Sequence, residues 1–211
     1  MMKFAGIPRS LLPAPGGSRT PRPFAIAIDG IGTSGKSTLG AVLSEELDAE
    51  LIHVDDYFLP FQKRTPERMT HQSMGNVEWE RLEREILRKL GDPQAVSCRF
   101  DCTAGDCTEP KVRDLSGVVI IEGVSILRRE LRKFFDLKLF IEISPEERLR
   151  RIALRDPEWK QKRWHSEWIP LEDAYFYSEL PKNAADYVLS GMRFFNEVRK
   201  CPANGFSEHR Y

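Results

Sequence analysis

The 211-residue chain lacks several features that would each indicate a class of function. It has no uninterrupted run of about 18 apolar residues, so the sequence predicts no membrane-spanning helix and no membrane partner. Lys plus Arg and Asp plus Glu number 32 each, so no excess of positive charge indicates a nucleic-acid partner. The N-terminal region has neither a signal-peptide core nor the amphipathic helix of a transit peptide. These absences favour a cytoplasmic protein.

Cysteine is scarce, with four residues at positions 98, 102, 107 and 201. The first three have C-x₃-C-x₄-C spacing, which lacks the paired C-x₂-C ligands of a structural zinc site. We therefore expect reduced thiols and no metal at these cysteines.

Proline and glycine set the expected boundaries. Residues 1–23 hold five prolines, the pair Gly16-Gly17 and no acid, which predicts an irregular arm that lies against the domain. The folded domain should span residues 24–191, and residues 192–211 form a C-terminal tail. That tail either docks on the domain or pairs with another subunit, so a homo-oligomer stays an open alternative.

What the chain does contain is a complete G-x-x-x-x-G-K-[ST] pattern over residues 30–37, directly after the apolar run from Phe24 to Ile28. A strand delivers the chain to a glycine-rich turn, and the following helix points its positive end at the same place. The pattern therefore predicts a phosphate-binding loop for a nucleotide. Its binding residues are Gly30, Gly32, Thr33, Ser34, Gly35, Lys36, Ser37 and Thr38, with Lys36 on the β- and γ-phosphates and Ser37 on Mg²⁺.

Strand-like and helix-like segments alternate along the rest of the domain. Strands are predicted at 24–28, 51–54, 118–121, 137–143 and 187–189, and helices at 36–47, 78–90, 145–154 and 171–177. This order predicts an α/β protein with a P-loop NTPase fold, in which helices flank a parallel sheet of about five strands.

Acidic residues stand where two of these strands end. Asp55 and Asp56 follow the second strand, and neighbours on an extended chain point in opposite directions, so one of them faces the phosphate site. A carboxylate there is suited to accept the proton of an attacking hydroxyl, whereas the other acid is expected to cap or bind. Glu122 ends the apolar strand 118–121, where a P-loop enzyme holds Mg²⁺.

Basic residues gather farther along the chain. Arg148, Arg151 and Arg155 share one helical face before the Asp156-Pro157 break. Such a run is commonly a solvated face. Beside a phosphate loop, it also matches a mobile helical lid over about residues 148–168 that brings positive charge to the γ-phosphate.

Together these motifs resemble the uridine kinase family of P-loop kinases. The resemblance spans about residues 24–191 and includes Arg64 to Arg68, Gly75 to Trp79, Arg99 to Cys102 and Glu122 to Val124. More distantly, the chain also resembles nicotinamide riboside kinase, phosphoribulokinase and pantothenate kinase.

The resemblance implies an ATP- and Mg²⁺-dependent kinase that phosphorylates a hydroxyl of a small, nucleoside-like molecule. It implies Asp55 as the base, Lys36 on the ATP phosphates, Ser37 and Glu122 on Mg²⁺, and Arg151 and Arg155 in the lid. The acceptor would then be bound by Asp56, Tyr57, Arg64, Arg68, Asn76, Phe100 and Asp101.

The chain departs from that family on the acceptor side. Phe100 stands where uridine kinases carry tyrosine, no histidine occurs in 101–109, and the Asp-His-Pro segment is replaced by residues 75–78. Two alternatives therefore stay open. One is a mononucleotide or other metabolite kinase, whose acceptor phosphate would pair with Lys63, Arg64 and Arg68. The other is a regulatory ATPase without an acceptor.

Overall fold

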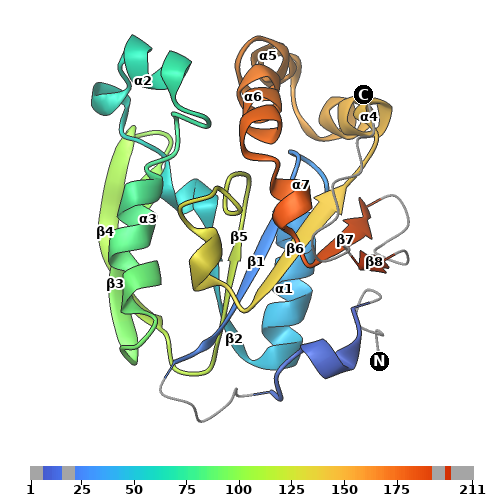
Figure 1. The fold of residues 1–211 in the computed structure, drawn as a ribbon. Helices are drawn as coiled ribbons and strands as arrows, with labels where there is room; N and C mark the ends of the chain where they lie inside the picture. The colour runs from blue at the N-terminus through green and yellow to red at the C-terminus, as the bar shows by residue number, and fades with distance from the viewer. Residues whose placement is uncertain (1–6, 16–21, 192–197, 201–211) are drawn as a thin grey trace.

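The computed structural model describes residues 7–15, 22–191 and 198–200 (Figure 1). Its main sheet has the order β2-β5-β1-β6-β7-β8, in which the first five strands are parallel and β8 is antiparallel to β7. The bounds of these strands are β1 Phe24–Gly30, β2 Ala49–His53, β5 Val118–Glu122, β6 Leu137–Glu142, β7 Tyr187–Ser190 and β8 Val198–Lys200. The predicted parallel sheet of about five strands is confirmed, with β8 added at one edge.

Helices and 3₁₀ turns connect the strands. The helices are α1 Lys36–Leu47, α2 Pro66–His71, α3 Trp79–Glu85, α4 Pro145–Arg155, α5 Glu158–Arg163, α6 Ile169–Glu179 and α7 Pro181–Ala184. The 3₁₀ turns are η1 Arg9–Leu11, η2 Val54–Tyr57, η3 Phe61–Lys63, η4 Leu87–Lys89 and η5 Arg132–Phe134, and η6 Trp164–Trp168 is a π-helical turn. No helix of the described residues combines the length and apolar character that crossing a membrane requires.

Both faces of the sheet are buried, which explains why β1 and β5 are apolar at nearly every position. Leu39, Leu43 and Leu47 of α1 pack on one face, and Ile7 and Leu12 of the N-terminal segment join the same cluster. The other face packs against α3, the segment after β5, and α6. The described part of the predicted arm thus lies against the domain, whereas residues 1–6, 16–21, 192–197 and 201–211 lie outside the described residues.

The predicted helix over residues 78–90 is divided. The backbone departs from helical dihedral angles at Ile86 (φ −121°, ψ −61°), and a 3₁₀ turn follows. Ile86, Leu87 and Leu90 are all buried, so core packing outweighs helix propensity at this point.

A second sheet was not predicted. The hairpin of β3 (Gln94–Asp101) and β4 (Asp106–Asp114) lies along the α3 side of the molecule (Figure 1). Its strands carry polar residues and Pro110, which hide a strand pattern. The expectation of reduced thiols is wrong for Cys98 and Cys107, which form a disulfide across this hairpin, whereas Cys102 is free and exposed and Cys201 lies outside the described residues.

Buried charges attach the hairpin to the main sheet. Arg113 of β4 is 4% exposed, and it donates to Asp56 Oδ2 (3.0 Å), to Glu50 Oε1 (3.2 Å) and to Ser97 Oγ (3.1 Å). Arg81 of α3 donates to the Asp56 carbonyl oxygen (2.9 Å) and to that of Cys98 (2.9 Å). Asp56 is therefore the point at which β2, α3 and the hairpin meet.

We expect Arg113→Met to lower the free energy of unfolding by roughly 3–5 kcal/mol, because it leaves the carboxylate of Asp56 buried with one exposed cation, Arg99, as its remaining ion-pair partner. Urea denaturation would measure the change. The double variant Asp56→Asn/Arg113→Met removes both charges and should recover part of the loss. If the two substitutions act independently, the double variant is less stable than Arg113→Met by the full cost of Asp56→Asn. That result would contradict the coupling of the two charges.

Candidate active site

The phosphate loop has the geometry that its glycines predict. Gly30 (φ +145°) ends β1, and a Cβ there would collide with the Ile141 carbonyl of β6. Gly35 (φ +106°) is the N-cap of α1, so the helix begins at Lys36 with its free N–H groups at the loop. Lys36 is 8% exposed and donates from Nζ to the Ile31 carbonyl (2.8 Å). The lysine thus lies folded across the loop, while Ser37 and Thr38 are exposed at the first turn of α1.

Behind the loop, Asp29 fixes its position. This fully buried carboxylate accepts from its neighbour Gly30 N–H (2.6 Å), from Leu127 N–H (2.8 Å) and from the Tyr175 hydroxyl (2.6 Å). Burial raises the pKa of Asp29, although these hydrogen bonds oppose the shift. Asp29 thereby holds together β1, the segment after β5 and α6.

Two predicted catalytic acids lie at the carboxyl edge of the sheet. Asp55 is in η2 directly after β2, and Glu122 is the last residue of β5. Solvent reaches Asp55, yet desolvation by the surrounding protein and the negative charge of Glu122 raise its pKa, while Lys36 and His53 oppose the rise. Because β5 lies between β1 and β2 in the parallel sheet, the phosphate loop after β1, Asp55 after β2 and Glu122 at the end of β5 lie at the same carboxyl edge.

Glu122 is 4% exposed and lies against α1, since a Cβ on Gly40 would come within 3.4 Å of its Cγ. His53 Nδ1 lies 2.5 Å from Glu122 Oε1, and this contact raises the pKa of His53. The sequence reasoning did not single out His53. The register that pairs His53 with Glu122 follows from the parallel pairing of β2 with β5.

The other predicted acceptor residues have varied surroundings. Asp56 carries the ion pairs described above, and Tyr57 is fully buried beneath the guanidinium of Arg81, 4.5 Å from the ring centroid. The Arg68 guanidinium donates to the Glu80 carboxylate and to the carbonyl oxygens of Gly75 and Val77. Asp101 caps the hairpin turn through Thr103 N–H (2.7 Å).

Three aromatic rings form one wall of the acceptor side. Phe100 packs edge-on against Phe58 and Phe61, with ring centroids 5.9 and 5.8 Å away. The Arg64 guanidinium lies over the exposed ring of Phe61 at 4.7 Å, and desolvation lowers the pKa of Arg64. Asn76 is 4% exposed, and its Oδ1 has no hydrogen-bond partner among the described residues.

The segment predicted to form a lid contacts the loop directly. Arg151 of α4 donates to the carbonyl oxygens of Thr33 (3.0 Å) and Gly191 (2.6 Å). Glu172 of α6, which the sequence reasoning missed, accepts from Gly32 N–H (2.9 Å). It also accepts from Arg148 (2.6 Å), so the buried Arg148–Glu172 pair holds α4 and α6 on the loop.

Arg155 has a different place from the other two predicted lid arginines. Its exposed side chain pairs with Asp156 (2.8 Å), which also accepts from Trp164 Nε1 (2.8 Å). Burial alone would raise the pKa of Asp156, but hydrogen bonds from Arg155, Trp164 and Lys160 lower it to about 2. Trp164 in turn lies against the loop, because a Cβ on Gly32 would collide with its ring.

The π-helical turn joins α5 to α6. Ile169 N–H donates to the Trp164 carbonyl five residues earlier, and Pro170 has no N–H to offer the carbonyl four residues before it. This irregular turn places Trp164 and Glu172 on the same side, toward Gly32.

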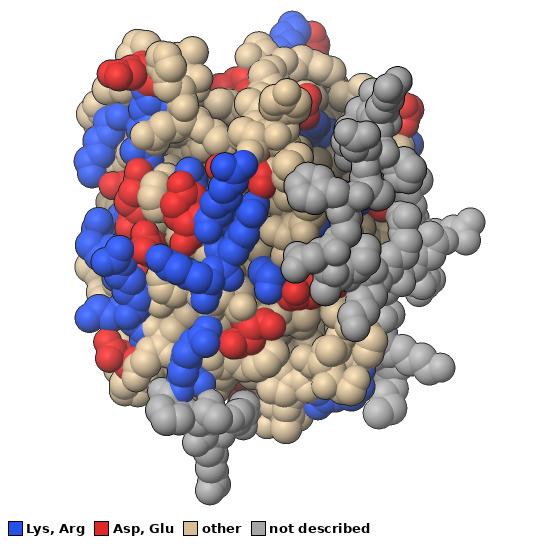
Figure 2. Space-filling model, viewed as in Figure 1, with Lys and Arg blue, Asp and Glu red and all other residues tan. Residues whose placement is uncertain are grey.

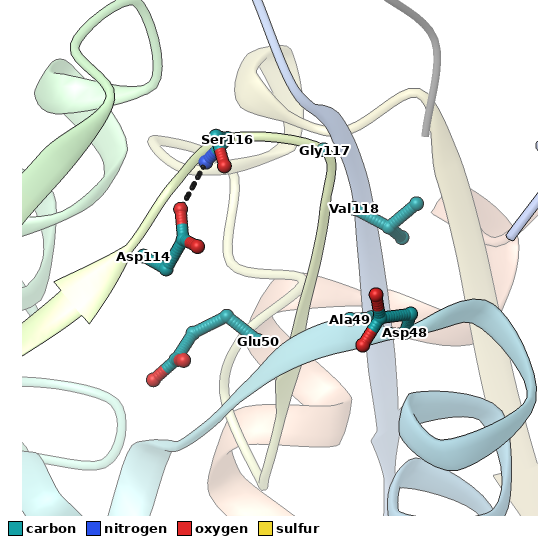
Figure 3. Close-up of a pocket in the computed structure, with 7 residues that line it drawn as sticks. All are labelled: Asp48, Ala49, Glu50, Asp114, Ser116, Gly117 and Val118. Carbon is teal, nitrogen blue, oxygen red and sulfur yellow. Dashed lines mark hydrogen bonds between the residues drawn. The ribbon is translucent and has the colours of Figure 1, made fainter. Parts of the chain in front are cut away.

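A hollow of about 220 Å³ lies at the opposite edge of the sheet (Figure 3). Asp48, Glu50, Asp114 and the start of β5 line it, and the Asp114 carboxylate accepts from Ser116 N–H (2.8 Å). Because it adjoins the amino ends of parallel strands, it does not belong to the phosphate site.

Comparison with known proteins agrees with this geometry. A model of the shikimate kinase family (SKI) matches residues 32–187. The uridine kinase of Chlamydia pneumoniae is 26% identical over 204 residues, which cover 87% of this chain and 89% of the relative. The uridine kinase of Ureaplasma parvum is 27% identical, with 81% of this chain and 89% of the relative covered. The chain belongs to the kinase family that this model describes, because the match covers more than half of the chain, and it is similar to these two uridine kinases.

Further matches extend the comparison. The chain spans 60% of the length of uridine-cytidine kinase B from Dictyostelium discoideum, to which it is 25% identical. A structure of a possible uridine kinase from Bacillus stearothermophilus has a TM-score of 0.62 at 24% identity, covering 81% of this chain and 90% of that one. A putative fructose transport system kinase from Silicibacter has a TM-score of 0.69 at 19% identity, covering 85% and 96%. These two structures support the fold.

Membership in this family identifies an ATP-dependent small-molecule kinase, a phosphotransferase that acts on a hydroxyl group. The predicted fold class, family and enzyme class are thus confirmed. The roles of individual residues remain predictions.

We expect Arg151→Ala to lower kcat by roughly 10²-fold, because the guanidinium that holds the Thr33 carbonyl also adds positive charge beside the loop. Arg150→Ala is a matched control on the same helix: Arg150 pairs with Glu147 and its side chain is 60% exposed, so its loss should change kcat less than twofold. Hydrogen exchange over residues 148–168 should slow when a non-hydrolysable ATP analogue binds. Full turnover in Arg151→Ala with unchanged exchange would limit Arg151 to a structural contact with the loop and would reject the lid.

Proposed function

We propose that the protein transfers the γ-phosphoryl group of ATP to a hydroxyl of a nucleoside-like acceptor, in the manner of a uridine kinase. The observation that carries this proposal is that Lys36, Asp55 and Glu122 follow or end three adjacent parallel strands at one edge of the sheet, with Glu122 packed against α1. The names of the curated relatives support the acceptor class.

In this mechanism the N–H groups at the start of α1 and Lys36 bind the phosphates of ATP. Asp55 accepts the proton from the acceptor hydroxyl as that oxygen attacks the γ-phosphorus, and ADP is the leaving group. Arg151 keeps the Thr33 carbonyl in place, and Trp164 and Glu172 cover the loop from the lid side, which helps to exclude water.

Mg²⁺ fits the residues that are present. Glu122 offers a buried carboxylate against α1, and the exposed Ser37 hydroxyl lies at the start of that helix, so hard oxygen donors come from two adjacent elements. When bound, the ion would neutralise charge on the β- and γ-phosphates. Ser37 and Glu122 would hold it, directly or through water.

The acceptor would lie on the opposite side of Asp55 from α1, beside the wall of Phe58, Phe61 and Phe100. The exposed Phe61 ring provides a flat apolar surface for a base, with Arg64 stacked over it. Asn76 has a buried amide oxygen without a partner, which is suited to accept a hydrogen bond from a polar acceptor group.

An ATP-consumption screen over nucleosides, mononucleotides, ribosides, pantothenate and sugar phosphates tests this function. We expect turnover with a nucleoside and a loss of 10² or more in Lys36→Ala, which removes a preorganised charge from the phosphates. Turnover restricted to phosphate-bearing acceptors would favour a mononucleotide kinase, and ATP hydrolysis insensitive to every acceptor would favour a regulatory ATPase. Either result would reject the proposed acceptor.

We expect Asp55→Asn to lower kcat far more than it changes ATP affinity, because the amide keeps the shape but cannot accept the proton. The base must be deprotonated, and its pKa is raised, so the acidic limb of the wild-type pH–kcat/KM profile should lie above the ordinary aspartate value of about 4. Asp56→Asn is the control, and it should lower the free energy of unfolding instead of kcat. If Asp56→Asn abolishes turnover while Asp55→Asn retains it, the assignment is reversed.

A further inference from the structure

A second cavity, of about 330 Å³, lies outside the catalytic edge. It is lined by residues from four segments: His71, Gln72 and Ser73 at the end of α2, Trp79 of α3, Arg128 and Glu130 after β5, and Ser178 and Glu179 of α6. None of the residues assigned above to ATP, Mg²⁺ or the base lines it. In Figure 1, the segment after β5 lies in front of the sheet. Figure 2 shows the same face, and basic side chains gather over its middle.

Arg128 is the unusual member of this lining. It is 5% exposed, and its guanidinium stacks on the Trp79 ring at 4.3 Å. Its Nε donates to Glu130 Oε2 (3.0 Å), but Nη1 is buried without a hydrogen-bond partner among the described residues. A buried cationic nitrogen that lacks an acceptor is costly, because water no longer solvates it.

Other hydrogen-bond donors beside Arg128 also lack acceptors. Trp79 Nε1 and Ser73 Oγ are both buried without partners among the described residues, and an indole N–H can only donate. The lining therefore offers an indole N–H, a hydroxyl and a guanidinium, a set that matches the oxygens of an anion.

The acids around the cavity are already matched by cations. Glu130 pairs with Arg128, and Glu179 accepts from Arg129 N–H (3.0 Å) and lies 3.9 Å from Arg132 Nη2. Both glutamates of the lining are thus paired with arginines, while Nη1 of Arg128 keeps no acceptor among the described residues. His71 is turned to the Glu67 carbonyl (3.0 Å).

From these observations we propose that the cavity binds a small metabolite through a phosphate or carboxylate group, with Arg128, Trp79 and Ser73 as its donors. The site is distinct from the phosphate loop. It joins the start of α3, near the acceptor side, to the end of α6, the helix that carries Glu172. A bound anion would hold these two elements together.

Binding of inorganic phosphate to the full-length protein tests the site. The phosphate loop is first saturated with Mg²⁺ and a non-hydrolysable ATP analogue, and phosphate is then titrated by calorimetry at constant ionic strength. We expect saturable binding at one further site, and Arg128→Gln should weaken it by about tenfold or more. Arg129→Gln is the matched control, because Arg129 is the next residue, its side chain is 64% exposed, and its loss should change the Kd less than twofold.

A parallel titration with succinate distinguishes carboxylate from phosphate as the preferred group. Trp79→Phe keeps a ring under Arg128 but removes the N–H, and should weaken binding several-fold. This variant decides the question if Arg128→Gln does not fold, as judged by its affinity for the ATP analogue. The proposal is overturned if neither anion binds saturably to wild type beyond the loop, or if Arg128→Gln and Trp79→Phe both bind as wild type does.

Discussion

The buried carboxylate of Asp29 is the contact on which the arrangement of the site depends. It is the last side chain before the phosphate loop, and it receives hydrogen bonds from the segment after β5 and from α6. Asp29 is fully buried, and losing any of its hydrogen bonds in the core would be costly. The groups that donate to it are therefore held in place. The loop, the segment after β5 and α6 are consequently placed relative to one another by a single side chain.

Local patterns were sufficient to predict the phosphate loop, a parallel sheet of about five strands and the bounds of α1. The reason is that each depends on residues close in sequence: glycines at a strand end, a lysine and serine at a helix start, and apolar runs buried on both faces. The carboxylates after β2 and at the end of β5 could be placed for the same reason, because parallel strands bring their carboxyl ends to one edge.

Features that depend on distant residues could not be predicted. Arg113 meets Asp56 across 57 positions, and Glu172 meets Gly32 across 140, and nothing in the local sequence marks these partners. The β3–β4 hairpin was not predicted, because buried Ser97 and Arg113 and exposed Val96 and Val112 disrupt the usual alternation of buried apolar and exposed polar residues. Pro110 is also unusual within a strand. The disulfide within it also followed only from the pairing of the two strands.

The contact of Trp164 with Gly32 links the identity of two positions that lie 132 residues apart in the sequence. Position 32 has no room for a Cβ beside the Trp164 ring and the Glu172 carboxylate, so a larger residue in the loop requires a smaller residue at position 164 and a shift of the Glu172 side chain. Substitutions at either position are then constrained as a pair.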